Sequence, residues 1–220
     1  MSIAHHVSGD LLLGYGAGTL DEATSILVAT HLALCPACRD GLALAEAVGG
    51  VLMDWGQTKA AAGETVPEVG APEGQEGVES QGAAQRPGAP SRSFVLPQPL
   101  RDCVGGDAAE LRWRALGGGI RHVPLSTRGT GAGARLLSIG AGKRVPQHGH
   151  RGAELTLVLA GALYDREAWY RRGDVDAAGA SVVHRPAAGP EEDCICLAVT
   201  DAPLKFGSLI PRLLQPFLGV

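Results

Sequence analysis

The pattern of hydrophobic and polar positions changes twice along this chain of 220 residues. Over residues 1–56 apolar residues recur at helical spacing, and over 94–220 short apolar runs alternate with Gly, Pro and Asp. The segment 57–93 consists mainly of Ala, Gly, Glu, Gln and Pro and holds no aromatic residue, Ile or Leu. The pattern therefore predicts an all-α domain at 1–56, a flexible low-complexity linker at 57–93 and an all-β domain at 94–220.

Start and stop signals divide the first part into three helices. Ser8 is placed to cap the first helix. Thr19, with a Glu three residues later, has the form of a capping box and predicts the start of the second helix. Pro36 suits the first turn of a third helix, which we expect to end near Gly49–Gly50. We expect no amphipathic helix between residues 56 and 93.

Composition and charge limit the classes of function. Hydrophobic residues make up 45% of the chain, which is enough for a core, and the net charge of −4 argues against a general nucleic-acid binder. Residues 1–56 carry one basic and six acidic residues, whereas residues 94–220 carry 15 basic and 12 acidic ones. An acidic helical domain favours a basic partner. Solvated surface charge kept for solubility explains the same imbalance.

The sequence also predicts a compartment. No apolar run reaches the roughly 18 residues of a membrane span, and the first ten residues lack the pattern of a secretory signal. We therefore expect a cytoplasmic protein without membrane contact. Five cysteines are an odd number, and two of them form a Cys-x2-Cys. In a reducing compartment this indicates metal or redox chemistry and not a disulfide framework.

The first candidate site is His31, Cys35 and Cys38. Helical spacing places His31 and Cys35 on one face, and both thiolates of a Cys-x2-Cys can reach one ion. Zinc needs a fourth ligand, for which His6 is favoured while His5 remains open. A thioredoxin-like redox motif would need a βαβ setting, and ordinary core cysteines are the other alternative. A domain of this size often needs a metal to stabilise it, so we predict structural zinc.

The second candidate site lies in the β domain. His148 and His150 point the same way on a strand, and Glu154 follows at an even spacing. Two imidazoles and a carboxylate suit a mononuclear divalent metal site, for which Zn, Fe, Mn and Ni are all candidates. His184 is the third imidazole that a later strand can supply. The alternative is a metal-free pocket lined by the same polar residues.

Single residues outside these sites carry weaker predictions. Cys194 and Cys196 share one face of an apolar strand and are expected to be buried, and Cys103 is assigned to the β domain. His122 has no neighbouring residue of a ligand type and is expected at the surface. The tryptophans are expected to pack against other residues of the protein and not to bind a ligand; they are Trp55, Trp113 and Trp169.

Each candidate site resembles that of a known family. An early His followed by His31-x3-Cys35-x2-Cys38 resembles the zinc-binding anti-sigma family over residues 1–55. The resemblance implies a domain that binds an ECF-type sigma factor and blocks its access to core RNA polymerase. That family often has a fourth helix on the sigma factor, and here the corresponding stretch is rich in Gly and Pro. Whether 57–93 supplies such a helix stays open.

The string Gly-x5-His148-x-His150-x3-Glu154-x6-Gly matches the first cupin motif in full. The resemblance covers residues 94–220 and implies a jelly-roll barrel with His184 as a further metal ligand. The second cupin motif is matched only in part, because its Pro is replaced by Ala177 and four residues instead of two precede the His. The resemblance leaves open a homodimer through the cupin.

The two resemblances together indicate a ChrR-type anti-sigma factor. They imply a regulator without enzymatic activity whose helical domain holds a sigma factor and whose cupin promotes release under singlet oxygen or organic peroxide. The partner is then a sigma factor, and no direct contact with nucleic acid is expected. The alternative is a cupin metalloenzyme, a dioxygenase or hydrolase, that carries a small zinc-binding domain. Against it, no further acid, base or nucleophile accompanies the predicted ligands.

Overall fold

The first helix, α1 (Gly9–Gly16), forms as predicted in a computed structural model that describes residues 2–62, 94–128, 132–201 and 205–206. The Ser8 side chain accepts a hydrogen bond from the backbone N–H of Leu11 at 3.3 Å, which satisfies one of the free donors of the first turn. Gly18 follows with φ of +66°, a conformation that ends a helix.

The second helix, α2 (Glu22–Leu34), does not begin with the predicted cap. The Asp21 carboxylate accepts from the backbone N–H of Thr24 at 3.0 Å and from its hydroxyl at 2.7 Å. Thr19 instead donates its hydroxyl to the carbonyl of Gly14 at 3.2 Å. The capping box was therefore wrong. A charged Asp at the N-terminus satisfies the same donors and also faces the positive end of the helix dipole.

The third helix, α3 (Pro36–Ala62), starts at the predicted proline but does not end at Gly49–Gly50. Two glycines inside a helix cost about 1 kcal/mol each relative to alanine, and the Leu, Ala and Met residues around them are good helix formers. The helix enters the predicted linker and reaches Ala62. The rest of that linker, 63–93, lies outside the described residues.

A short helix, α4 (Gln98–Val104), interrupts the region predicted to be all β. Pro97 precedes it, a further proline lies in its first turn, and Gly105 ends it with φ of +81°. Leu100 is fully buried, and α4 packs against α2. Cys103 lies on this helix and is exposed, so its assignment to the β domain proper was wrong.

The remaining strands form a cupin-like β domain, as predicted. They make one six-stranded sheet in the order β1-β2-β3-β11-β5-β8 and two three-stranded sheets, β10-β6-β7 and β12-β4-β9. Among the described strands these ladders do not join into one closed barrel. The strands are β1 Arg114–Gly117, β2 Ile120–Pro124, β3 Gly133–Ile139, β4 His148–Gly149, β5 Glu154–Ala160, β6 Ala162–Asp165, β7 Ala168–Arg171, β8 Val175–Ala178, β9 Val183–His184, β10 Ala187–Ala188, β11 Cys194–Thr200 and β12 Lys205–Phe206.

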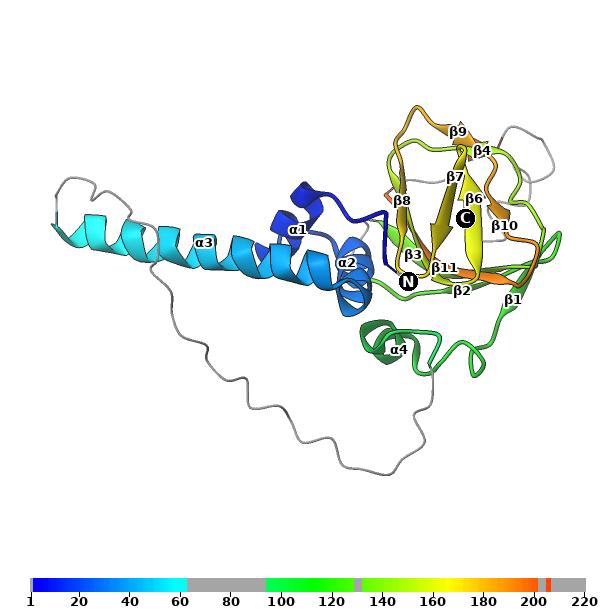
Figure 1. Cartoon of the computed structure of the whole chain (residues 1–220), viewed down its shortest axis with the longest axis horizontal. Helices are drawn as coiled ribbons and strands as arrows, with labels where there is room; N and C mark the ends of the chain where they lie inside the picture. The colour runs from blue at the N-terminus through cyan, green and yellow to red at the C-terminus, as the bar shows by residue number, and fades with distance from the viewer. Residues whose placement is uncertain (1, 63–93, 129–131, 202–204, 207–220) are drawn as a thin grey trace, which may run out of the picture. The chain divides into compact units, whose positions relative to one another are not determined.

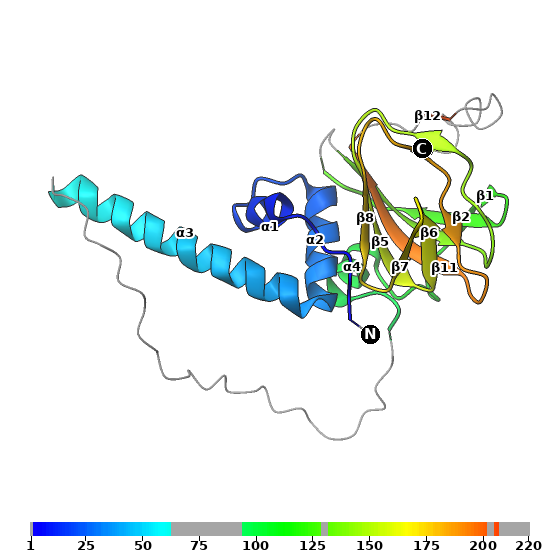
Figure 2. The same cartoon turned by 45° about the horizontal axis from the view of Figure 1, so that its top comes forward.

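The structure divides into two compact units, Met1–Glu46 with Phe94–Val220 and Ala47–Ser93. Within the first unit α2 packs against β3 and β11. Figures 1 and 2 show the helices and strands of the chain. The two surfaces share one core, whose fully buried members include Ala23, Leu27, Val28, Leu136, Leu157 and Leu197. A single apolar core therefore joins the helical region to the largest sheet of the β domain.

Among the predictions about single residues, the one for His122 was wrong and the one for the tryptophans held only in part. His122 is buried with 7% exposure, because it lies two residues after Ile120 on β2 and shares its buried face. Trp169 is 46% exposed, whereas Trp113 is half-buried and donates from Nε1 to the carbonyl of Ala108 at 2.9 Å. Cys194 and Cys196 are buried on β11, as predicted.

Among the described helices, none is by itself long and apolar enough to cross a membrane. The bent pair Glu22–Leu34 and Pro36–Trp55 reaches that threshold together, by length and composition only.

Candidate metal centres

The first predicted cluster assembles where α2 meets α3. His31 lies in the last turn of α2, Cys35 is the C-cap of that helix, and Cys38 lies in the first turn of α3. His6 joins them from the segment before α1. Its Nδ1 lies 3.3 Å from Cys35 Sγ and 3.4 Å from Cys38 Sγ, and His31 Nε2 lies 3.2 Å from Cys38 Sγ. One ligand atom from each residue lies within 4.8 Å of the others.

His5 takes a different position. Its ring lies against Tyr170, with 4.6 Å between the ring centroids, and it is not among the four grouped residues. The structure thus places His6, and not His5, beside the two thiols. The sequence could not separate the two, because adjacent residues in an extended segment differ only in the direction of their side chains.

The donor set fits zinc. Two imidazoles and two thiols are the ligands that form closed tetrahedral zinc sites. Burial and the neighbouring Cys35 thiol raise the pKa of Cys38 to about 11, so without an ion this thiol stays protonated. Burial also lowers the pKa of His31, which favours the neutral imidazole that a metal needs. A bound zinc ion would be held by His6, His31, Cys35 and Cys38.

One contact fixes the orientation of the His31 ring. Its Nδ1 lies 2.8 Å from the carbonyl oxygen of Gly173, in the turn between β7 and β8. A carbonyl can only accept, so Nδ1 carries the proton and donates it. The lone pair of Nε2 is thereby left facing Cys38. Metal-bound histidines commonly donate their other ring nitrogen in this way.

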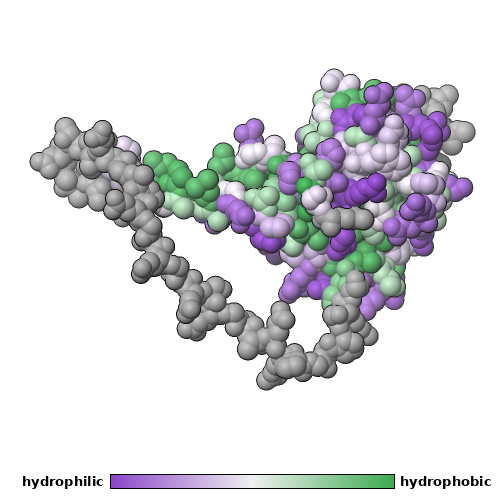
Figure 3. Space-filling view, viewed as in Figure 1, coloured by the Kyte–Doolittle hydropathy of each residue, from purple (hydrophilic) through white to green (hydrophobic). Residues whose placement is uncertain are grey.

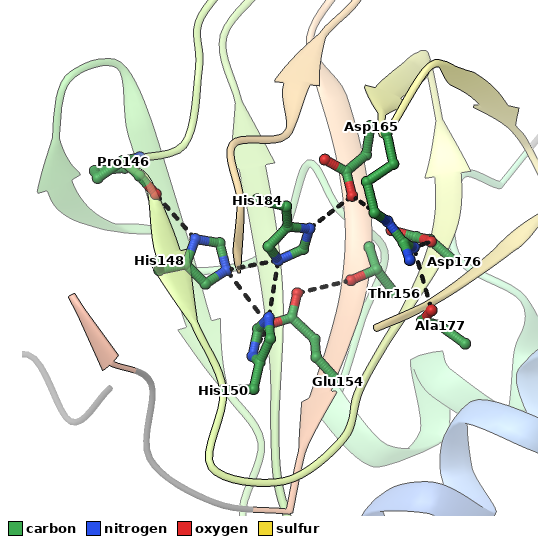
Figure 4. A network of polar contacts seen from close by, with 10 residues as sticks. Pro146, His148, His150, Glu154, Thr156, Asp165, Asp176, Ala177 and His184 are labelled. Carbon is green, nitrogen blue, oxygen red and sulfur yellow. Dashed lines mark hydrogen bonds and ion pairs between the residues drawn. The ribbon is translucent and has the colours of Figure 1, made fainter. Parts of the chain in front are cut away.

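The second predicted cluster assembles inside the β domain (Figure 4). His148 and His184 lie opposite each other on the paired strands β4 and β9, and Glu154 begins β5. His150 comes from the bend after β4. His184 Nε2 lies 2.9 Å from His150 Nε2 and 3.1 Å from His148 Nε2. All four side chains are buried.

This geometry fits one divalent ion. Nitrogens bound at about 2.1 Å lie about 3 Å apart when their bonds meet at a right angle, which matches the observed spacing. The Glu154 carboxylate lies 3.3 Å from His150 Nδ1 and 3.6 Å from His148 Nε2. Within the described residues His150 Nδ1 has no hydrogen-bond partner although it is buried. An ion held by His148, His150, Glu154 and His184 would satisfy groups that otherwise face one another.

The ionisable groups of this cluster shift one another's pKa values. Burial opposes ionisation of Glu154, but its hydrogen bond with His148 and the surrounding histidines lower the pKa of Glu154 overall. Burial alone would lower the pKa of His148, yet the Glu154 carboxylate raises it. Burial lowers the pKa of His150. The Glu154 carboxylate and the His148 imidazole therefore each favour the charged form of the other, an interaction that a bound metal ion would replace.

Sequence reasoning missed the residues that orient these ligands. Asp165 Oδ2 lies 2.6 Å from His184 Nδ1, so it accepts the proton of that ring and leaves Nε2 for a metal. Arg166 contacts both Asp165 and the buried Asp176. Asp165, Asp176 and His184 also group closely enough to hold an ion. No spacing rule marks these residues, since they come from the hairpin β6–β7 and from β8.

Comparison with known proteins agrees with these features. Residues 103–203 match the family described as the ChrR cupin-like domain. Along its whole length the chain is 47% identical to the anti-sigma-E factor ChrR of Cereibacter sphaeroides, which is likewise covered in full.

Two solved structures are similar to parts or most of this chain. The crystal structure of Rhodobacter sphaeroides SigE in complex with the anti-sigma ChrR matches with 46% identity and a TM-score of 0.70, covering 91% of this chain and 100% of that one. An RmlC-like cupin from Ralstonia eutropha JMP134 is 20% identical with a TM-score of 0.41, over 47% of this chain and 71% of the other. The identity along the full chain shows that this protein belongs to the ChrR family of anti-sigma factors.

Proposed function

We propose that this chain holds an ECF-type sigma factor through residues 1–56 and releases it when its cupin, 94–220, receives a stress signal. In this proposal residues 57–93 connect the two parts of the chain. Sequestration of a sigma factor takes place in the cytoplasm and needs neither a membrane nor direct contact with nucleic acid. A relative that is 47% identical is an anti-sigma-E factor, and a similar chain forms a complex with SigE; both support this assignment.

The observation that carries the proposal is the exposed apolar surface of α3. Val48, Val51, Leu52 and Trp55 recur at intervals of three and four residues and are 37–60% exposed. Such spacing places them on one stripe of the helix. Figure 3 shows the corresponding hydrophobic surface in green along α3. An amphipathic helix that offers an apolar stripe suits a groove on a protein partner.

Zinc in the N-terminal cluster would hold the start of this helix in place. Cys35 is the C-cap of α2 and Cys38 lies in the first turn of α3, so an ion bound to both would hold the junction of these two helices. The net charge of residues 1–56, one basic against six acidic residues, suits the basic surface of a DNA-binding partner. We propose that the zinc is structural and sets the shape of the sigma-binding surface.

The cupin ion, Zn, Fe, Mn or Ni, would act as the sensor. Bound to His148, His150, Glu154 and His184, a divalent ion would offer coordination positions to singlet oxygen products or an organic peroxide. The histidines and Glu154 hold it in a buried setting, where a change of ligand or charge must alter the packing around it. A homodimer through the cupin is compatible with this role and is part of the proposal.

The proposal is tested with the cognate sigma factor and the full chain. The double variant Val48→Asp/Val51→Asp should weaken sigma binding at least about 100-fold, because it places two charges in an apolar contact. Trp169→Ser alters an exposed residue of the β domain and serves as the control. Equal affinity for the double variant and the control would contradict the docking assignment. Failure of the wild type to bind would contradict the function itself.

Release is measured separately. A Glu154→Ala variant should bind the sigma factor as the wild type does but no longer release it after exposure to organic peroxide. If the variant releases the sigma factor at the wild-type rate, the cupin metal has no role in sensing.

A further inference from the structure

The turn between β7 and β8 holds both segments that carry the N-terminal histidine ligands. The Asp174 carboxylate oxygen Oδ1 accepts from the backbone N–H of Ala4 at 2.7 Å and from that of His5 at 3.0 Å. The backbone N–H of Val175 donates to the carbonyl of His5 at 3.0 Å. These three bonds fix the backbone immediately before His6.

The same turn holds the other histidine. The carbonyl of Gly173 accepts from His31 Nδ1 at 2.8 Å, as described above. His6 and His31 are 25 positions apart in the sequence, yet two consecutive cupin residues position both of them. The second Asp174 oxygen, Oδ2, accepts from the backbone N–H of Arg171 at 2.8 Å, which ties the carboxylate to its own turn.

Packing leaves little freedom at this junction. Gly173 has φ of +93°, and a Cβ atom there would lie 2.4 Å from Cδ1 of Ile3. The N-terminal segment therefore lies directly over the turn, at a distance that only glycine permits. The cluster and its support thus belong to one compact unit of the structure.

We propose that Gly173 and Asp174 of the cupin complete the N-terminal metal site, as positioning residues that hold His6 and His31 in ligating geometry. The site is then shared: its ligands come from the helical region and its outer contacts from the β domain. Loss of the turn contacts weakens metal binding at the thiols of Cys35 and Cys38, which belong to the helical region. The inference rests on metal binding at the N-terminal cluster, as proposed above.

Strand β8 follows this turn directly and connects it to the cupin metal cluster. Asp176 on β8 contacts Arg166, whose Nε donates to Asp165 Oδ2 at 3.0 Å. That same oxygen accepts from His184, the candidate ligand of the cupin ion. A change in the cupin site that moves β8 therefore acts on the outer contacts of the zinc ligands.

The test compares Asp174→Ala with Asp107→Ala in the full chain. Asp107 is a matched control, because its carboxylate also accepts from two consecutive backbone N–H groups, those of Val95 and Leu96, away from both clusters. Cobalt is the first probe, since only a site with thiolates gives a sulfur-to-cobalt charge-transfer band. Zinc affinity at that site is then measured by displacement of cobalt against a chelator.

We expect Asp174→Ala to weaken zinc binding at the thiolate site by 10- to 100-fold, the usual effect of removing an outer-shell partner. The cobalt bands should also change position, which a general loss of stability would not cause. Asp107→Ala should remain within about twofold of the wild type. Equal affinities and identical bands for the two variants would overturn the inference.

A conservative pair keeps the test decisive if the alanine variant does not fold. Asn at position 174 retains an oxygen for the Ala4 and His5 donors but loses the acceptor for Arg171. Asp174→Asn should therefore lower zinc affinity by about three- to tenfold, less than Asp174→Ala does, while Asp107→Asn should stay within about twofold of the wild type. A wild type without the charge-transfer band would contradict zinc binding itself, whereas a normal wild type with an unaltered Asp174→Asn would contradict only the shared site.

Discussion

The two candidate metal centres differ in how their ligands are held. In the cupin cluster the ligands and the groups that orient them all come from the β domain. Asp165 holds His184, and the carbonyl of Pro146 lies 2.9 Å from His148 Nδ1. In the N-terminal cluster the ligands come from one segment and two helices, but His31 depends on the cupin carbonyl of Gly173. One site is supported locally and the other is supported from a distant part of the chain.

This difference suggests how a sensor and an effector can share one chain. A site supported by its own domain keeps its ligand geometry when other parts of the protein move. A site whose ligands are held by contacts from another domain responds when that domain moves. The thiolate cluster includes Cys38 in the first turn of α3, the proposed sigma-binding helix, so dependence of this cluster on the cupin gives the direction of control that release requires.

The largest change in metal affinity is expected when a thiolate of the N-terminal cluster is removed. Cys38→Ser should lower zinc affinity at the N-terminal cluster by roughly 100- to 1,000-fold, taking about a quarter of the 10–16 kcal/mol typical of structural zinc. Sigma binding should fall with it. Cys103→Ser is the matched control, because that thiol is exposed on α4. Competition with a chromophoric chelator measures the affinity, and a normal value for Cys38→Ser would exclude the cysteine as a ligand.

A carboxylate substitution tests the other site. Glu154→Gln removes the negative charge that the buried histidines face and should lower cupin metal affinity by about 100-fold, the upper end of outer-shell effects and a modest value for a ligand. The thiolate-to-cobalt band should stay unchanged. Glu191→Gln alters an exposed residue and controls for the charge. The metal content is measured by elemental analysis after dialysis. If Glu154→Gln loses both metals, metal binding at the thiolate site depends on the cupin site.

The sequence predicted which residues come together in the two clusters better than it predicted the residues around them. His31, Cys35 and Cys38 sit at spacings that only a helix and the turn after it bring together, and the cupin motif fixes three further residues within 13 positions of Gly142. The structure brings all eight predicted residues together in two groups. Their assignment as metal ligands remains a prediction that the variants above address.

The contacts that support His184, His31 and the segment before His6 could not be predicted, because they join residues that are 19 to 170 positions apart. In the sequence Asp174 is an ordinary turn residue, and only the structure shows that it binds the N-terminal segment. The length of α3 was missed for a local reason: Gly49–Gly50 signals a helix end, but the flanking residues favour the helix more than two glycines disfavour it. The helix α4 was missed because its seven residues carry no periodic pattern.

Chelation should distinguish the metal from the core as sources of order. Leu27 and Val28 are fully buried in the core shared with the sheet, so α2 should stay folded when zinc is removed. The segment around His6 should lose hydrogen-exchange protection, since it depends on the ion and on a few backbone bonds. We expect protection to fall at Ala4 and His5 by about tenfold and at Leu27 by less than twofold. A global loss of protection would mean that the metal, and not the core, maintains the helices.

The smallest expected effect concerns communication between the sites. Asp165→Asn should change zinc affinity at the N-terminal cluster by less than about threefold, because it acts through Arg166 and β8 and touches no ligand there. In a double-mutant cycle with Asp174→Asn, the two changes should couple by about 0.5 kcal/mol, since they act on the two ends of one connected network. Additive effects would show that Asp174 supports the thiolate site without connection to the cupin ion. A shared site that is mechanically separate from the sensor would then need another route for release, such as exposure of the segment between residues 57 and 93 to a protease.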